Sequence, residues 1–159
     1  MPENASTLSL QDRFAPNLIC FGCGPANTKG LRIKSYASED GTVTAHFEPA
    51  VHHQAFEGML NGGIIGTLVD CHMNWTAAWT LMQNRGADKP PCTVTSEFSV
   101  RFSKPTPVDN PIKLIATAIS SSDRKVETRA ELWANDELTA TSTGVFVAVK
   151  EGHPAWHRW

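Results

Sequence analysis

The sequence has no run of about 20 apolar residues, the length that crosses a bilayer. Its most apolar stretch, residues 64–81, is interrupted by Asp70, His72 and Asn74. The first residues, from Met1 to Ser6, lack the basic and apolar regions of a secretory signal. We therefore expect a cytoplasmic protein with no membrane partner.

Runs of basic residues are also missing. Fourteen Lys and Arg side chains are balanced by sixteen Asp and Glu, which leaves a formal net charge of −2. A nucleic-acid-binding surface needs clustered positive charge to contact phosphates, so we expect no nucleic-acid partner. The sequence also lacks Gly-x-Ser-x-Gly, the usual signature of a serine hydrolase.

Only one closely spaced pair of cysteines is present. Cys20 and Cys23 form a Cys-x-x-Cys, whereas Cys71 and Cys92 stand alone. Structural zinc sites usually have four ligands, which commonly come as two such pairs. We therefore interpret the cysteines as reduced packing residues and expect no metal and no cofactor. A thiol-redox or zinc module centred on the pair is the alternative.

The length of 159 residues is suited to one domain with a core of its own. Residues 1–28 are polar and turn-rich and end in the compact segment 20–25, so we interpret them as an N-terminal arm that contains the Cys-x-x-Cys turn. Residues 29–150 then form the folded domain, and residues 151–159 form a short aromatic tail.

Strand patterns flank one long helical pattern. Alternation predicts strands at 31–36 and 43–47, joined by a hairpin at Asp40-Gly41. A helix is expected over 62–82, and four strands near 94–102, 112–119, 126–132 and 138–149. Short links imply antiparallel pairing, and a lone helix must bury its apolar side. We therefore predict an α+β fold with a curved antiparallel sheet of five to six strands wrapped around one long central helix.

The two sides of the expected helix differ in bulk. At about 100° per residue, large apolar residues gather on one side and small or polar residues on the other. The first set is Ile64, Leu68, Trp75, Trp79 and Met82, and the second is Gly63, Gly66, Thr67, Asp70, Asn74 and Ala77. We expect the bulky side to pack on the sheet and the small side to leave room for a substrate or another subunit.

The start of this helix has the features of a carbonyl-binding site. Gly62 and Gly63 open the helix, whose first amides have no partner within it and carry partial positive charge. An outside group can approach glycine amides closely, so these amides can polarise a carbonyl and stabilise an oxyanion. Alternatively, the glycines only let the helix pass close to a strand.

Asp70 lies about two turns into the helix among small residues. A carboxylate in such a place needs a partner or water. It is either a buried aspartate bonded to a hydroxyl, or a general base or nucleophile that faces a cleft. The small residues around it favour the second interpretation.

The segment Gly58 to Asp70 resembles the motif of hotdog-fold acyl-CoA thioesterases of the phenylacetate-pathway type. Their motif runs roughly Gly-x-x-His-Gly-Gly, then five residues, then a small-apolar pair that ends in Asp. The Cys20–Pro25 segment, His53-Gln54, and the strand that begins at Thr95 and ends in Lys104-Pro105 are similar to theirs as well. The resemblance extends from Cys20 to about Val149 and implies a hotdog fold.

The resemblance also implies roles for individual residues. The Gly62 amide would polarise the thioester carbonyl, Asp70 would activate water or attack the carbonyl, and Thr95 would help to place Asp70 or the water. Asn61 stands where the family has His; it can cap the helix but cannot take up a proton near neutral pH. The expected substrate-binding residues are Gly63, His53, Gln54, Asn74 and Lys104.

Family members usually build each site between two subunits, so we expect a homodimer or a dimer of dimers that hydrolyses acyl-CoA or another thioester. Two alternatives within the fold remain open. One is a non-catalytic acyl-CoA-binding protein, which Asn61 favours. The other is an enoyl-CoA hydratase, although the Asp and His pair typical of such enzymes is not seen before the helix.

Overall fold

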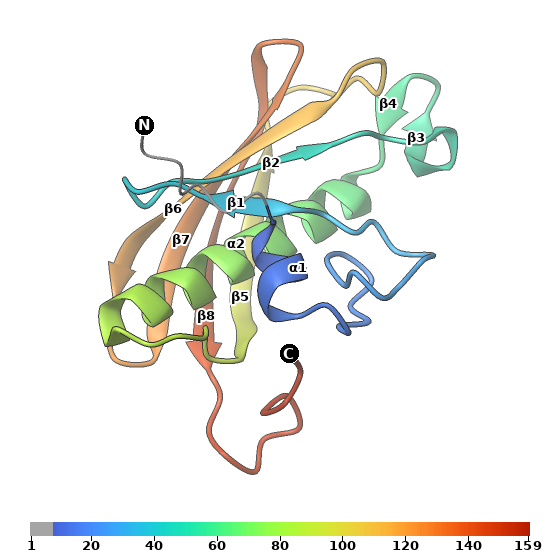
Figure 1. Cartoon of the computed structure of the whole chain (residues 1–159). Coiled ribbons are helices and arrows are strands. Elements are labelled where there is room, and N and C mark those ends of the chain that lie inside the picture. Colours follow the sequence, from blue (N-terminus) through green and yellow to red (C-terminus); the bar gives the residue numbers. More distant parts are fainter. Residues whose placement is uncertain (1–7) are drawn as a thin grey trace, which may run out of the picture.

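The computed structural model describes residues 8–159, and a long helix, α2 (Gly62–Arg85), runs through its centre (Figure 1). Asn61 caps the first turn of α2 through its side-chain oxygen. Gly86 ends the helix in the left-handed conformation, with φ 58°, which glycine adopts without strain. The helix therefore extends three residues beyond its expected end.

A six-stranded antiparallel sheet curves around α2 in the order β1-β2-β6-β7-β8-β5. Its strands are β1 (Ser35–Ala37), β2 (Val43–Phe47), β5 (Thr93–Phe102), β6 (Ile112–Ser121), β7 (Lys125–Ala134) and β8 (Glu137–Ala148). This architecture confirms the expected α+β fold, with an antiparallel sheet of six strands around one long helix. β5 is an edge strand, and its outer edge has no partner strand among the described residues.

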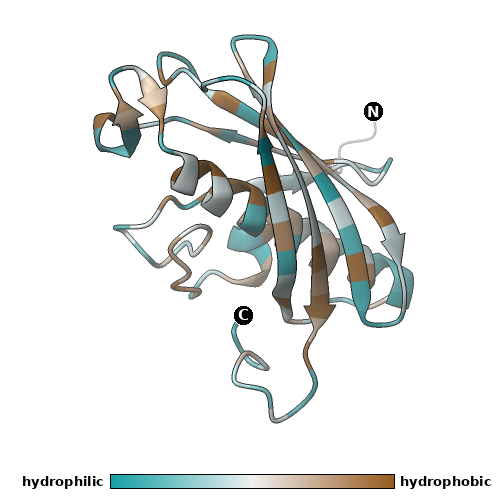
Figure 2. Cartoon of the chain, turned by 180° about the vertical axis from the view of Figure 1, so that it is seen from behind, coloured by the Kyte–Doolittle hydropathy of each residue, from teal (hydrophilic) through white to brown (hydrophobic). Residues whose placement is uncertain are grey.

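The sheet packs on α2 through one face of each strand. Hydrophobic and hydrophilic residues alternate along the strands (Figure 2), because successive side chains point to opposite faces of a sheet. On the inner face Leu114, Ala130, Leu132 and Phe146 are fully buried. Each large side chain of this kind contributes about 1.5–3 kcal/mol by leaving water, so the contact between sheet and helix is the main source of stability.

The first expected strand is shorter than its sequence pattern indicates. Only Ser35–Ala37 join the sheet as β1, since Arg32 has a positive φ of 49° that breaks the extended chain. The amides of Leu31 and Ile33 instead donate to the carbonyls of Phe21 and Gly22 in the arm. Tertiary contacts with the arm thus replace the sheet pairing that alternation alone predicts.

Two short elements and a small hairpin complete the fold. They are the helix α1 (Leu10–Phe14), the 3-10 turn η1 (Val51–His53), and the hairpin of β3 (Gln54–Phe56) and β4 (Met59–Leu60). The sequence pattern does not reveal this hairpin, because it is only five residues of strand inside a polar loop. The hairpin leads directly into the start of α2.

The arm and the tail cover the side of α2 that the sheet does not. Trp75 is fully buried, yet its indole N–H donates to Cys23 Sγ at 3.4 Å and its ring stacks on Trp159 with centroids 4.6 Å apart. The expectation that the whole bulky side packs on the sheet is therefore wrong for Trp75. Residues 1–7 of the expected arm lie outside the described residues.

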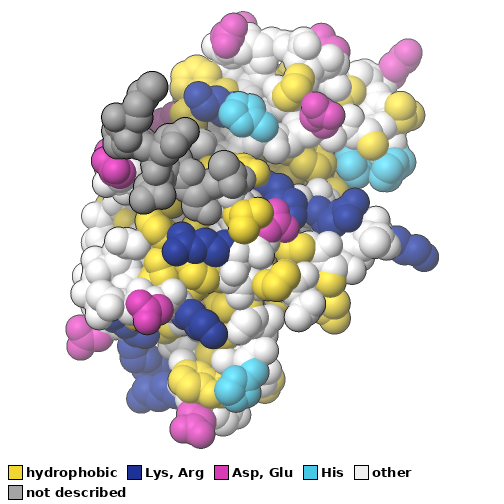
Figure 3. Space-filling model, in the orientation of Figure 1, with side chains coloured by type: hydrophobic (Ala, Val, Ile, Leu, Met, Phe, Trp, Pro, Cys, Tyr) yellow, Lys and Arg dark blue, Asp and Glu magenta, His cyan; other side chains and the backbone are white. Residues whose placement is uncertain are grey.

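Acidic and basic side chains are interspersed with hydrophobic ones on the face shown in Figure 3, in keeping with the nearly balanced charge of the sequence. Between residues 8 and 159, no helix has both the length and the apolar character needed to span a membrane.

His72 joins α2 to the first two strands. Its Nε2 lies 3.0 Å from the carbonyl oxygen of Val43, and its Nδ1 lies 2.8 Å from Ser35 Oγ. Burial lowers the pKa of His72 to about 4, with the Val43 hydrogen bond acting in the opposite direction. The ring is therefore neutral, so Nε2–H donates to the carbonyl and Nδ1 accepts from the serine hydroxyl.

This buried histidine predicts a loss of stability in mild acid. Between pH 6.5 and about 4 the unfolded chain binds a proton at His72 that the folded chain does not, so the free energy of unfolding falls as the pH falls. At 1.36 kcal/mol per pKa unit the loss approaches about 3 kcal/mol. Urea unfolding across this pH range measures it.

The matched variant is His72→Gln, whose amide can still donate to the carbonyl but does not titrate. We expect its stability to vary less between pH 6.5 and 4 than that of the wild type, while the exposed His157→Gln keeps the wild-type pH dependence. Parallel curves for wild type and His72→Gln would show that His72 is not the titrating group.

Candidate functional site

Asp70 and Thr95 are in direct contact. Thr95, on β5, donates its hydroxyl to Asp70 Oδ1 at 2.7 Å. Among residues 8–159 the second carboxylate oxygen, Oδ2, forms no hydrogen bond, and it is not sealed from solvent. One oxygen of the carboxylate is thus fixed in place while the other remains available to water or to a substrate carbonyl.

The surroundings of Asp70 favour a basic carboxylate. Burial raises the pKa of Asp70 above its ordinary value, the Thr95 hydrogen bond lowers it, negative charge on Cys20 raises it, and Arg158 lowers it. A carboxylate with a raised pKa accepts a proton more readily, which suits a general base.

Asn74 lies one turn beyond Asp70 and is buried. Its Oδ1 accepts a hydrogen bond from Thr93 Oγ1 at 2.7 Å, and its Nδ2 reaches the carbonyl oxygen of Thr93 at 3.5 Å. Asn74 and Asp70 therefore both bind β5 through threonine hydroxyls, which holds α2 and β5 in register. The role of Asn74 in substrate binding stays a prediction, and the side chain is only 5% exposed.

The start of α2 leaves one amide free. Asn61 Oδ1 accepts hydrogen bonds from the amides of Gly63 at 2.8 Å and Ile64 at 3.1 Å. The Gly62 amide forms no hydrogen bond within the described part of the chain. Because the cap already occupies the next two donors, Gly62 is the amide of this helix end that an external carbonyl would meet.

His53 and Gln54 hold the loop that precedes this helix end. The backbone carbonyl of His53 accepts a hydrogen bond from the Asn61 amide at 2.9 Å, and the His53 side chain accepts one from the Ala50 amide at its Nδ1, also at 2.9 Å. Partial burial lowers the pKa of His53, and the neighbouring His52 adds to the effect. Gln54 Oε1 accepts from the Gly58 amide, and its Nε2 donates to the Val51 carbonyl. Both side chains act within the loop.

Lys104 lies past the end of β5. Its ammonium pairs with Glu137 at 3.2 Å, and both side chains are more than half exposed. A pair so exposed contributes little to stability, so the lysine is free to exchange partners.

Apart from Lys104, the predicted residues thus form two groups, one at the start of α2 and one around Asp70. One group, at the helix end, contains Asn61, Gly62, Gly63 and the loop at 53–54. The other, two turns further along, contains Asp70, Thr95 and Asn74. Eight residues at about 1.5 Å each place the two groups about 12 Å apart along the axis. The spacing in the sequence predicts this separation, but it does not predict which side chains the residues of each group contact.

Arg158 and Cys20 are neighbours of Asp70 that sequence reasoning missed. Arg158 donates to the Thr93 carbonyl at 3.0 Å, and its charge lowers the pKa of Asp70. Cys20 approaches from the arm. The aromatic character of the tail is the one sequence signal that indicates a packed segment there, and no local pattern points to Asp70.

Comparisons with known proteins agree with this architecture. The sequence profile of the thioesterase superfamily matches residues 57–141, more than half of the chain. No curated protein matches the chain. Among solved structures, a thioesterase superfamily protein from Shewanella loihica is 28% identical with a TM-score of 0.64, over 79% of this chain and 98% of that chain.

Two further structures show the same fold at lower identity. The PaaI protein from the phenylacetic acid degradation operon of E. coli is 13% identical with a TM-score of 0.63, over 76% of this chain and 81% of its own. The BH2602 protein from Bacillus halodurans, solved with CoA, is 22% identical with a TM-score of 0.63, over 79% and 80%. These likenesses confirm the expected hotdog fold.

The Asn61 cap makes a prediction about stability. Replacing a capping asparagine by alanine leaves two amides without a partner and costs about 1 kcal/mol. We expect Asn61→Ala to lower the free energy of unfolding by this amount in urea. Asn61→Asp should not, because its carboxylate accepts the same bonds and interacts favourably with the helix dipole. Equal stability of the alanine variant and the wild type would contradict the cap.

Proposed function

Because the chain belongs to the thioesterase superfamily, we propose that it hydrolyses the thioester bond of an acyl-CoA-type substrate, with Asp70 as general base or nucleophile. The observation that carries the proposal is the half-satisfied carboxylate. Thr95 binds Oδ1, and Oδ2 is unbonded among residues 8–159. A carboxylate so oriented is ready to take a proton from water or to attack a carbonyl.

In the general-base form of the reaction, Asp70 Oδ2 removes a proton from a water whose oxygen attacks the thioester carbon. Negative charge then develops on the carbonyl oxygen, and the Gly62 amide donates a hydrogen bond to it. Collapse of the tetrahedral intermediate breaks the carbon–sulfur bond. The thiolate leaves and takes up the proton held by Asp70, which restores the carboxylate, and the acid is released.

One chain alone does not bring these two groups together. A carbonyl that accepts from Gly62 while its carbon is attacked near Asp70 needs both groups within a few ångströms, yet the helix separates them by about 12 Å. We infer that the Gly62 amide of one subunit and Asp70 of another serve the same substrate in a homodimer or a dimer of dimers.

The surface beside the two groups supports this assembly. β5 is an edge strand, and its Phe98 and Phe102 are 40% and 55% exposed. Phe102 lies beside Gly62, and Phe98 lies beside Gly66. Unpaired edges and exposed aromatic side chains favour association with another chain, and here both adjoin the proposed site.

The first prediction from this proposal concerns Asp70→Asn. Removing a general base typically costs 10²–10⁴-fold in rate, so we expect turnover to fall by about that factor. The thermal midpoint should stay near that of the wild type, because asparagine has almost the same shape and can still accept from Thr95. Release of free thiol from short, aromatic and long acyl-CoA substrates measures turnover.

The exposed Asp88→Asn is the matched control and should keep wild-type turnover. Full activity of Asp70→Asn would remove Asp70 from the chemistry. A wild-type protein that binds CoA esters but hydrolyses none of them would instead support the non-catalytic acyl-CoA-binding alternative, in which Asn61 replaces the family histidine.

The second prediction isolates the Gly62 amide. Proline is well tolerated at the first position of a helix and has no N–H, and the extended backbone of Asn61, with ψ 135°, suits a residue that precedes proline. A Cβ at Gly62 meets only Phe102, at an ordinary contact distance of 3.5 Å. We expect Gly62→Pro to fold and to lose about 10²–10³-fold in turnover, as removal of an oxyanion donor does.

Gly62→Ala is the matched control, since it adds the same Cβ and keeps the amide; it should stay close to wild-type turnover. Equal losses in the two variants would mean that bulk, not the missing donor, is responsible.

Mixing Gly62→Pro with Asp70→Asn tests the shared site. Suppose that each site takes Gly62 from one subunit and Asp70 from the other. After subunit exchange of an equal mixture, half of the dimers contain one subunit of each variant, and one of the two sites in such a dimer is intact. Activity should then recover to about a quarter of the wild-type value. Two sites each built within one chain would recover nothing on mixing.

A further inference from the structure

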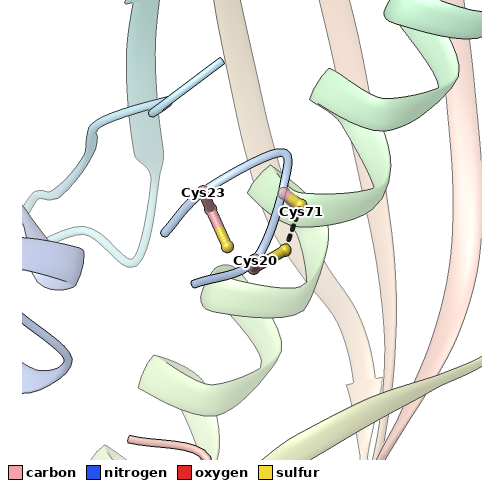
Figure 4. A group of neighbouring side chains, drawn as sticks. All are labelled: Cys20, Cys23 and Cys71. Atoms are coloured by element: carbon pink, nitrogen blue, oxygen red, sulfur yellow. Dashed lines mark hydrogen bonds between the residues drawn. The ribbon is translucent and has the colours of Figure 1, made fainter. Parts of the chain in front are cut away.

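Three cysteine sulfurs converge where the arm crosses α2 (Figure 4). Cys20 and Cys23 come from the arm and Cys71 from the helix, and their Sγ atoms all lie within 4.8 Å of one another. The Sγ atoms of Cys20 and Cys71 are 3.7 Å apart. The fold thus adds a third sulfur to the Cys-x-x-Cys pair. In the sequence this pair has no other cysteine nearby.

The local structure brings these sulfurs together. A Cβ at Gly22 would overlap Cys71 Sγ and the Thr67 methyl group, so only glycine lets the arm lie this close to the helix. The Trp75 indole N–H donates to Cys23 Sγ at 3.4 Å and orients that sulfur. Cysteine binds a metal as the thiolate, so metal binding at this cluster releases protons.

We propose that Cys20, Cys23 and Cys71 together bind one thiophilic metal ion, for which Zn²⁺ is the best match. Zinc–sulfur bonds of about 2.3 Å in tetrahedral geometry place neighbouring sulfurs about 3.8 Å apart. The Cys20–Cys71 distance of 3.7 Å already fits, and the remaining separations, at most 4.8 Å, need only small side-chain adjustments.

Charge and ligand type agree with this choice. As ligands of one divalent cation, the three thiolates carry a total charge of −1 instead of −3, so the ion removes most of the repulsion between them. Thiolate ligands select soft or borderline cations such as zinc over magnesium or calcium. Within residues 8–159 no fourth Cys, His, Asp or Glu atom joins the group, so the fourth position is left for water or another small ligand.

The proposed ion also has a structural consequence. It would fasten the arm to α2 at Cys71, the residue that follows Asp70. Because Cys20 and Cys23 are both in the arm, the ion would close a loop between distant parts of the chain, and binding would stabilise the folded state. This inference does not depend on the hydrolytic activity, and its readouts are separate from turnover.

The test uses the full chain, stripped of metal by a chelator in the presence of a reductant that does not bind metal. Zn²⁺ should bind with a stoichiometry of one per chain by elemental analysis. Zinc at a thousandfold excess over its dissociation constant should raise the thermal midpoint by roughly 10 °C. Co²⁺ should give the near-ultraviolet absorption of thiolate-to-cobalt charge transfer.

Variants assign the ligands. Cys20→Ser and Cys71→Ser should lose most of the zinc affinity and the cobalt absorption. Cys92→Ser, which alters the one cysteine outside the cluster, should keep both. If a variant fails to fold, alkylation of the wild type gives the same information: zinc should protect Cys20, Cys23 and Cys71 but leave the reactivity of Cys92 unchanged.

Three results would overturn the proposal. One is substoichiometric zinc without a change in thermal midpoint. Another is metal binding that Cys20→Ser and Cys71→Ser do not weaken. The third is a disulfide within the cluster in the protein as isolated from cells, because it would consume two of the three ligands.

Discussion

Gly62 and Asp70 stand on one rigid helix, and the rise of an α-helix sets about 12 Å between them. Neither the loop before α2 nor the strands beside it can shorten this distance. The sheet buries one side of the helix and the arm and tail bury much of the other, so α2 cannot bend to bring the amide and the carboxylate together. In the proposed mechanism each chain therefore contributes two half-sites, and the two are completed by a second copy.

The packing of α2 against the sheet also explains how Asp70 is oriented. Thr93 and Thr95 on β5 bind Asn74 and Asp70 on α2 through their hydroxyls. Alternate residues of a strand point to the same face, so two threonines two residues apart can bind two side chains one helical turn apart. The pairing of sheet and helix thus fixes the direction of the Asp70 carboxylate as well as the stability of the core.

Burial and the Thr95 hydrogen bond have the largest effects on the pKa of Asp70, and the arm and tail add charges nearby. Cys20 and Arg158 come from opposite ends of the chain, and their charges shift the pKa of Asp70 in opposite directions. Trp75 lies beneath both segments, in contact with Cys23 and Trp159. A side chain that looks like a sheet-facing core residue on a helical wheel therefore anchors the two chain ends instead.

Elements with local signals could be predicted from the sequence. Period-2 alternation marked β2 and the four strands β5 to β8, and the glycine-to-aspartate spacing indicated where Gly62 and Asp70 lie on the helix. The folded structure was needed to show that residues 31–33 bind the arm instead of the sheet and that Cys71 meets the Cys-x-x-Cys pair. Periodicity and capping depend on neighbours within a few residues, whereas these contacts join segments that only the packed fold brings together.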